Sequence, residues 1–184
     1  METISRKYFI KRICCAGACL CGFGAIGLSN NIETSNPTNE SNNKLNREWL
    51  AILLSNISEQ IEENEKRNIL KGCAYAHYAS LGMDTVLAHY KHDLDKFISF
   101  LESEWDWKIE YNKKDNTIIA DENKQVCVCP IAESIQNSNL SSLCYCSEGF
   151  AELMFSYIVQ RPVSATVISS IHRGNKSCKY KIEL

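Results

Sequence analysis

The spacing of apolar residues changes once along the chain, and this change constrains the fold more than any other pattern. From residue 48 to residue 101, apolar side chains recur every three or four positions, which is the spacing of amphipathic helices. Beyond Trp105 they alternate with polar side chains, as Trp107, Ile109 and Tyr111 do with their neighbours, which is the spacing of a half-buried strand. We therefore expect an α+β fold with N-terminal helices packed on an antiparallel sheet, a meander plus a C-terminal hairpin with one inserted helix.

The same patterns predict the individual elements. Residues 48–81 are expected to form one bent helix or two, and a further helix is expected to run from Asp84, as its N-cap, to Leu101. The inserted helix is predicted at 147–160. Strands are predicted at 107–111, 117–120, 125–129, 163–171 and 177–183.

The first 29 residues have the pattern of an export signal. Residues 5–11 (Ser-Arg-Lys-Tyr-Phe-Ile-Lys) resemble the twin-arginine consensus, with Lys7 in place of the second arginine and Ile10 in place of leucine, beside Arg6 and Phe9. An apolar run over residues 13–28 follows the basic residues, which is the order of a signal peptide. Its 16 residues fall short of the roughly 20 that a spanning helix needs. We predict export to the periplasm or extracytoplasmic face, with the export machinery as a partner.

Three fates of this segment remain open: cleavage near residues 27–29, retention as an anchor, or lipidation at Cys19. Contact with a membrane is expected only through the N-terminal segment in the last two cases. Residues 30–47 contain seven asparagines and little apolar surface, so we predict a disordered tether before a single domain over 48–184. The total charge of −2 becomes −5 without the first 29 residues, which disfavours nucleic acid as a partner.

Six cysteines lie beyond the N-terminal segment, and four of them form two Cys-x-Cys pairs. Cys127 and Cys129 are on a predicted strand, where side chains two apart face the same way. Cys144 and Cys146 precede the predicted helix start, where the helix dipole favours thiolate. We predict that these four residues form one metal site, with Cys178 close by. Four sulfurs in tetrahedral geometry typically hold zinc or an iron–sulfur centre.

Other interpretations of the cysteines stay open. An exported location favours disulfides, and cysteine is also a common buried apolar residue. Cys144 or Cys146 would act as a nucleophile only with a base such as His77 or His172 within reach. The sequence identifies no catalytic residue, so whether the protein is an enzyme is not decided.

The C-terminal third resembles the end of the 4-vinyl reductase-type domain. The resemblance rests on the motif that runs from Cys146-x-x-Gly149 through Ser170-x-x-x-Gly174-x-x-x-Cys178 to Ile182. It implies an α+β module that binds a small molecule, and its sensory members hold zinc with an acidic residue, two closing cysteines and one earlier cysteine. Of these positions, Cys178 and one of Cys144 or Cys146 match, whereas Ser170 and Val167 stand where a cysteine and the acid are expected.

The same closing stretch is similar to that of the L-2-amino-thiazoline-4-carboxylic acid hydrolase-like proteins. We therefore expect an exported domain that binds a metal, a small-molecule ligand, or both. The alternatives are an extracytoplasmic hydrolase of that second group, and a disulfide-stapled interaction domain without a ligand.

Overall fold

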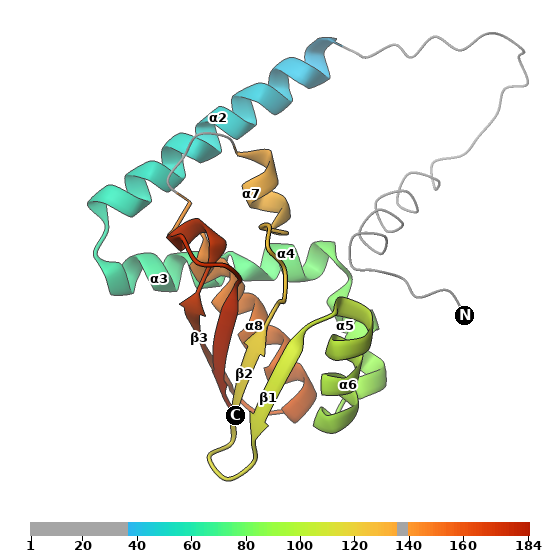
Figure 1. The fold of residues 1–184 in the computed structure, drawn as a ribbon. Coiled ribbons are helices and arrows are strands. Elements are labelled where there is room, and N and C mark those ends of the chain that lie inside the picture. The colour runs from blue at the N-terminus through green and yellow to red at the C-terminus, as the bar shows by residue number, and fades with distance from the viewer. Residues whose placement is uncertain (1–36, 136–139) are drawn as a thin grey trace, which may run out of the picture.

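A computed structural model describes residues 37–135 and 140–184 (Figure 1). The export-signal residues Arg6, Lys7, Phe9 and Ile10 lie outside the described residues, as does the first part of the predicted tether. Within the described ranges, no helix combines the length and apolar character needed to cross a membrane.

The predicted α+β fold is confirmed: helices precede and cover a four-stranded antiparallel sheet. Its strands lie in the order β1-β2-β4-β3. A hairpin joins the first two, and the last two form the C-terminal hairpin on either side of η2. The bounds are β1 Lys108–Asn112, β2 Thr117–Asp121, β3 Ser164–Ser169, η2 Ile171–Arg173 and β4 Lys179–Glu183.

One face of the sheet forms the core, because every second side chain of β2, β3 and β4 is buried. Ile118 and Ala120 of β2 and Tyr180 and Ile182 of β4 are 0–3% exposed. Helix α8 (Cys144–Val159) packs against this face and is itself covered by α3 (Glu63–Gly72) and α4 (Ala74–Ser80) (Figure 1). Since α8 lies between the sheet and the other helices, it is apolar on nearly all sides.

A glycine allows α3 and α4 to approach α8. A β-carbon at Gly149 would collide with the carbonyl oxygen of Lys71 and come within 2.9 Å of the Ala74 β-carbon. This position of α8 therefore has room for glycine but not for a residue with a side chain.

The helix predicted from Asp84 to Leu101 is interrupted. The structure has α5 (Met83–Leu87), a 3-10 turn η1 (Ala88–Tyr90) and α6 (Leu94–Trp105) in its place. Asp84 does not cap a helix but accepts a hydrogen bond from Tyr78 Oη at 2.9 Å. The chain instead turns at His92, whose φ is +65°, and the Asp93 carboxylate caps α6 by accepting the Lys96 N–H at 3.0 Å.

The start of the first helix also differs from the prediction. Helix α2 spans Pro37–Gln60, so residues 37–47 are helical and not part of a disordered tether. Proline fits the first turn of a helix because its missing N–H has no partner to lose there. About two turns later, a Lys44–Glu48 pair at 3.8 Å adds a small contribution to helix stability.

The predicted strand at 125–129 is absent, since residues 122–129 are described and form neither helix nor strand. The pairing with the chain before β4 extends to Glu122, whose N–H donates to the Cys178 carbonyl at 2.9 Å, and the chain then leaves the sheet at Asn123, where φ is +53°. A short helix, α7 (Pro130–Ser134), follows directly.

Candidate functional site

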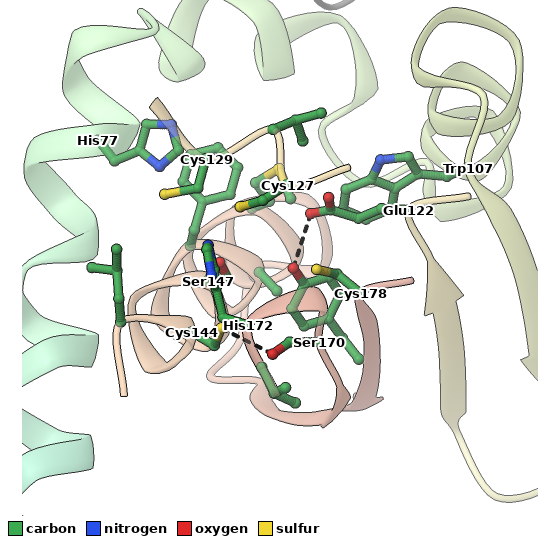
Figure 2. Close-up of a pocket in the computed structure, with 17 residues that line it drawn as sticks. His77, Trp107, Glu122, Cys127, Cys129, Cys144, Ser147, Ser170, His172 and Cys178 are labelled. Atoms are coloured by element: carbon green, nitrogen blue, oxygen red, sulfur yellow. Dashed lines mark hydrogen bonds between the residues drawn. The ribbon is translucent and has the colours of Figure 1, made fainter. Parts of the chain in front are cut away.

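A cavity of about 30 Å³ lies at one end of the sheet, beside the start of α8 (Figure 2). Four of the predicted cysteines line it: Cys127 and Cys129 from the 122–129 segment, Cys144 from α8 and Cys178 from the residue before β4. This volume has room for about two water molecules or one ion. Drug-sized organic ligands occupy pockets of roughly 300–1,000 Å³.

The first pair faces the cavity although the strand predicted to orient it is absent. Burial raises the pKa of the Cys127 thiol. The backbone N–H of Cys129 donates to the Cys127 sulfur and opposes this shift with a smaller effect. Cys129 also stands at the N-cap of α7, where its carbonyl accepts the Glu133 N–H at 3.1 Å. The 122–129 segment therefore carries two thiols to the cavity without the constraints of a sheet.

Cys144 is the first residue of α8 and is held by the strand opposite. Its Sγ donates to the Ser170 Oγ at 3.2 Å, drawn as a dashed line in Figure 2. Burial raises the pKa of Cys144, and the opposing effects of the Ser170 hydroxyl and the Arg173 guanidinium are smaller. The thiol is therefore protonated at neutral pH while it has no other partner.

Cys146 is absent from the described residues that line the cavity, although it is only 3% exposed. The helix begins at Cys144 and not at the predicted Ser147, so both cysteines belong to α8. Residues two apart on a helix point about 200° from each other, which turns Cys146 away from Cys144. Burial raises the pKa of Cys146 to about 12, in keeping with an inert packed thiol.

Cys178 lies where the sheet meets the cavity. Burial raises its pKa to about 12, and the backbone N–H of Ile171 opposes this effect. Cys127 and Cys144 line the same cavity as Cys178. The prediction that Cys178 lies close to the other thiols of the cavity agrees with this arrangement.

Two histidines also line the cavity. The His77 ring, on α4, stacks on Phe150 with centroids 4.7 Å apart. His172 lies in η2, and its Nε2 is buried without a hydrogen-bond partner among the described residues. The Trp107 Nε1 is in the same condition.

A carboxylate that the sequence did not single out completes the lining. Glu122 is 7% exposed and accepts a hydrogen bond from Tyr180 Oη at 2.9 Å (Figure 2). Burial and the Glu122 charge raise the pKa of Tyr180 well above its usual range. Its polar position just after an alternating strand was the only signal in the sequence, and that signal does not distinguish it from a solvated turn.

The thiols gather without forming a bond or a closed cage. Cys73, Cys127, Cys129, Cys144, Cys146 and Cys178 are all free thiols. Across residues 37–135 and 140–184, no three His, Cys, Asp or Glu side chains are already arranged to hold one ion. The arrangement supplies soft sulfur and nitrogen donors around a small space, and ion binding requires the side chains to close in.

Comparison with known proteins gives a family without an activity. No curated protein matches the chain. Residues 28–184 match the model of a family of unknown function, DUF6144, and this match covers all described parts of the domain. The chain therefore belongs to the DUF6144 family.

Proposed function

We propose that this domain binds one soft metal ion, zinc or iron, in the cysteine-lined cavity. The observation that carries the proposal is the convergence of four thiols from three separate segments on a space of about 30 Å³. Thiolate sulfur is the donor that zinc, copper(I) and iron–sulfur centres prefer. Buried thiols that serve only as packing have no need to meet at a cavity.

The size of the cavity favours an ion over an organic ligand. A space of about 30 Å³ accommodates a metal ion, whereas a small-molecule ligand or a hydrolase substrate needs about ten times that volume. The raised pKa values of Cys144 and Cys178 also argue against a thiolate nucleophile, since thiols are unreactive while protonated.

A metal ion changes this protonation state, because a ligating thiol loses its proton to the solvent as the metal binds. The closing movement falls on residues 123–129, which belong to neither a helix nor a strand and carry two of the four sulfurs. Cys144 and Cys178, on the helix and at the sheet, form the stationary half of the site.

The resemblance to the 4-vinyl reductase-type domain supports the same location for the metal site. Positions 167, 170 and 178, which the resemblance relates to zinc ligands, line this cavity, and so does Cys144, one of the two candidates for the remaining cysteine. Val167 and Ser170 cannot supply the missing acid and thiolate. Cys127 and Cys129 bring sulfurs to the same space, so a thiolate from this pair can take the place of a missing ligand.

The ion is carried to the extracytoplasmic side by the N-terminal segment. The twin-arginine-like motif favours export by the twin-arginine route. A domain that binds its metal in the cytoplasm while it folds would then be exported with the metal already bound. Arg6→Lys combined with Lys7→Gln is expected to retain a reporter fusion in the cytoplasm, and unchanged export in that variant points to the general secretory route.

Metal content of the purified full-length chain tests the proposal. The background carries serine at Cys14, Cys15, Cys19 and Cys21, so that thiols of the N-terminal segment do not contribute. Elemental analysis is expected to find one metal equivalent per chain, or one equivalent of zinc taken up on titration. Free thiols counted with a thiol reagent should fall in parallel.

The variants separate the cavity from the remaining thiols. Cys144→Ser and Cys178→Ser are each expected to lose the ion. Cys73→Ser, which changes an exposed cysteine outside the cavity, is the matched control and should keep it. A chain that takes up no metal, or whose uptake is unaffected by both cavity variants, refutes the proposal.

A further inference from the structure

We infer that His172 supplies a nitrogen ligand to the ion, so that the site is a three-sulfur, one-nitrogen zinc site and not a four-cysteine site. The inference rests on the proposed function and assigns a ligand that neither the cysteine spacing nor the family resemblance indicates. It begins from the His172 imidazole, whose Nε2 is buried at the cavity and has no hydrogen-bond partner among the described residues.

A buried nitrogen in this condition is costly. Leaving a polar group without a partner away from water destabilises the folded state, and native proteins contain few such groups. A metal ion in the cavity removes the cost, because the neutral imidazole presents a lone pair at the nitrogen that lacks a partner. The cavity already collects thiols, so one bound ion would satisfy both kinds of donor.

The turn that carries His172 is firmly held. The Ser170 carbonyl accepts the N–H groups of Arg173 and Asn175, each at 3.0 Å, and the Ser170 N–H donates to Asn175 Oδ1 at 3.1 Å. On the other side of His172, the Arg173 guanidinium lies 4.8 Å from the centre of the Tyr145 ring and donates to the Ser141 carbonyl at 3.3 Å. The residues on both sides of the histidine are therefore fixed.

The same turn is tied directly to a thiol of the cavity. Ser170, two residues before His172, accepts the hydrogen bond from Cys144 Sγ at 3.2 Å (Figure 2). His172 and Cys144 thus belong to one rigid unit, with Cys178 close by at the sheet. A nitrogen donor and two sulfurs stay in place while the 122–129 segment brings the third sulfur.

His77 is the competing imidazole, since it lines the same cavity. Its ring is stacked on Phe150, so a movement toward the thiols would give up that stacking. His172 has no ring contact to lose among the described residues. The mixed donor set also decides the metal, because three cysteines and one histidine make a common structural zinc site, whereas iron–sulfur clusters are usually held by cysteine alone.

X-ray absorption at the zinc edge tests the inference on the zinc-loaded full-length chain with the four N-terminal cysteines replaced by serine. The expected first shell contains three sulfurs at about 2.3 Å and one nitrogen at about 2.0–2.1 Å. In His172→Ala the nitrogen is lost and the zinc dissociation constant, from competition with a chromophoric chelator, rises at least tenfold. His89→Ala, in an exposed residue of η1, should change neither quantity.

A second variant guards against a simple loss of folding. His172→Cys restores a ligand of the other kind, so it should recover most of the zinc affinity and show a shell of sulfur only. A four-sulfur shell in the unmodified site overturns the inference while the proposed function stands. So does a nitrogen that persists in His172→Ala or disappears in His77→Ala. Absence of zinc from every variant overturns both.

Discussion

Two ion pairs join α3 to α8 and differ in how deeply they are buried. From this difference we predict how much unfolding free energy each pair contributes. Glu148 is fully buried and accepts from Arg67 Nε at 2.8 Å, from Arg67 Nη2 at 2.9 Å and from the Val167 N–H of edge strand β3 at 2.8 Å. One helical turn on, Lys71 and Glu152 pair at 2.5 Å, and Glu152 accepts the N–H of Ala165, two residues before Val167 on β3, at 2.9 Å. The second pair is 24% and 22% exposed.

Replacing the basic residue of each pair by methionine measures this difference. Arg67→Met keeps most of the side-chain stem but leaves the Glu148 carboxylate buried with only one N–H donor. Loss of one partner of a buried pair costs about 3–5 kcal/mol of unfolding free energy. Lys71→Met is the matched control, and because water reaches Glu152 its cost should be about 1 kcal/mol.

Urea unfolding of the metal-free chain, followed by circular dichroism at pH 7, measures both costs. Equal costs for the two variants, or a cost below about 1 kcal/mol for Arg67→Met, would show that burial does not control these pairs.

Two further predictions concern α8. Gly149→Ala should destabilise the domain by several kcal/mol in the same unfolding assay, on the order of an overpacked core, because the new methyl group meets the Lys71 carbonyl; a neutral effect would mean that α3 is free to move away. Alkylation of Cys146 by iodoacetamide at pH 8 should be about a thousandfold slower than in the unfolded chain, because burial raises its pKa from 9.0 to about 12 and only the thiolate reacts. The rate should rise with pH, and mass spectrometry of the peptide would reveal a reactive thiol that contradicts this.

The fold class could be predicted because the period of the apolar residues follows directly from backbone geometry. Strands β1 and β2 and the final hairpin lie where alternation predicted them, within about two residues. Helix α2 begins eleven residues earlier than expected, since Pro37 and the polar residues after it form a helix with little apolar burial. The composition of a segment indicates how much apolar surface it can bury, but it does not indicate whether the segment is helical.

The site was predictable only in part. The spacing of Cys127 and Cys129 suggested a common direction, and both do line the cavity, but a loop and not a strand brings them there. The pairing of Cys144 with Cys146 depended on the helix start, and a three-residue error there moved Cys146 to the other side of α8. Glu122 and His172 come to the cavity through tertiary contacts of β2 and η2, which no local pattern encodes.

Diffraction from crystals of the zinc-loaded chain, recorded on both sides of the zinc absorption edge, tests the metal site most directly. We expect one anomalous peak inside the cavity, about 2.3 Å from the sulfurs of Cys144, Cys178 and one of Cys127 or Cys129, and about 2.0–2.1 Å from His172 Nε2. Cys146 should lie outside this coordination shell. An empty cavity, with the zinc bound elsewhere or not at all, would contradict the account.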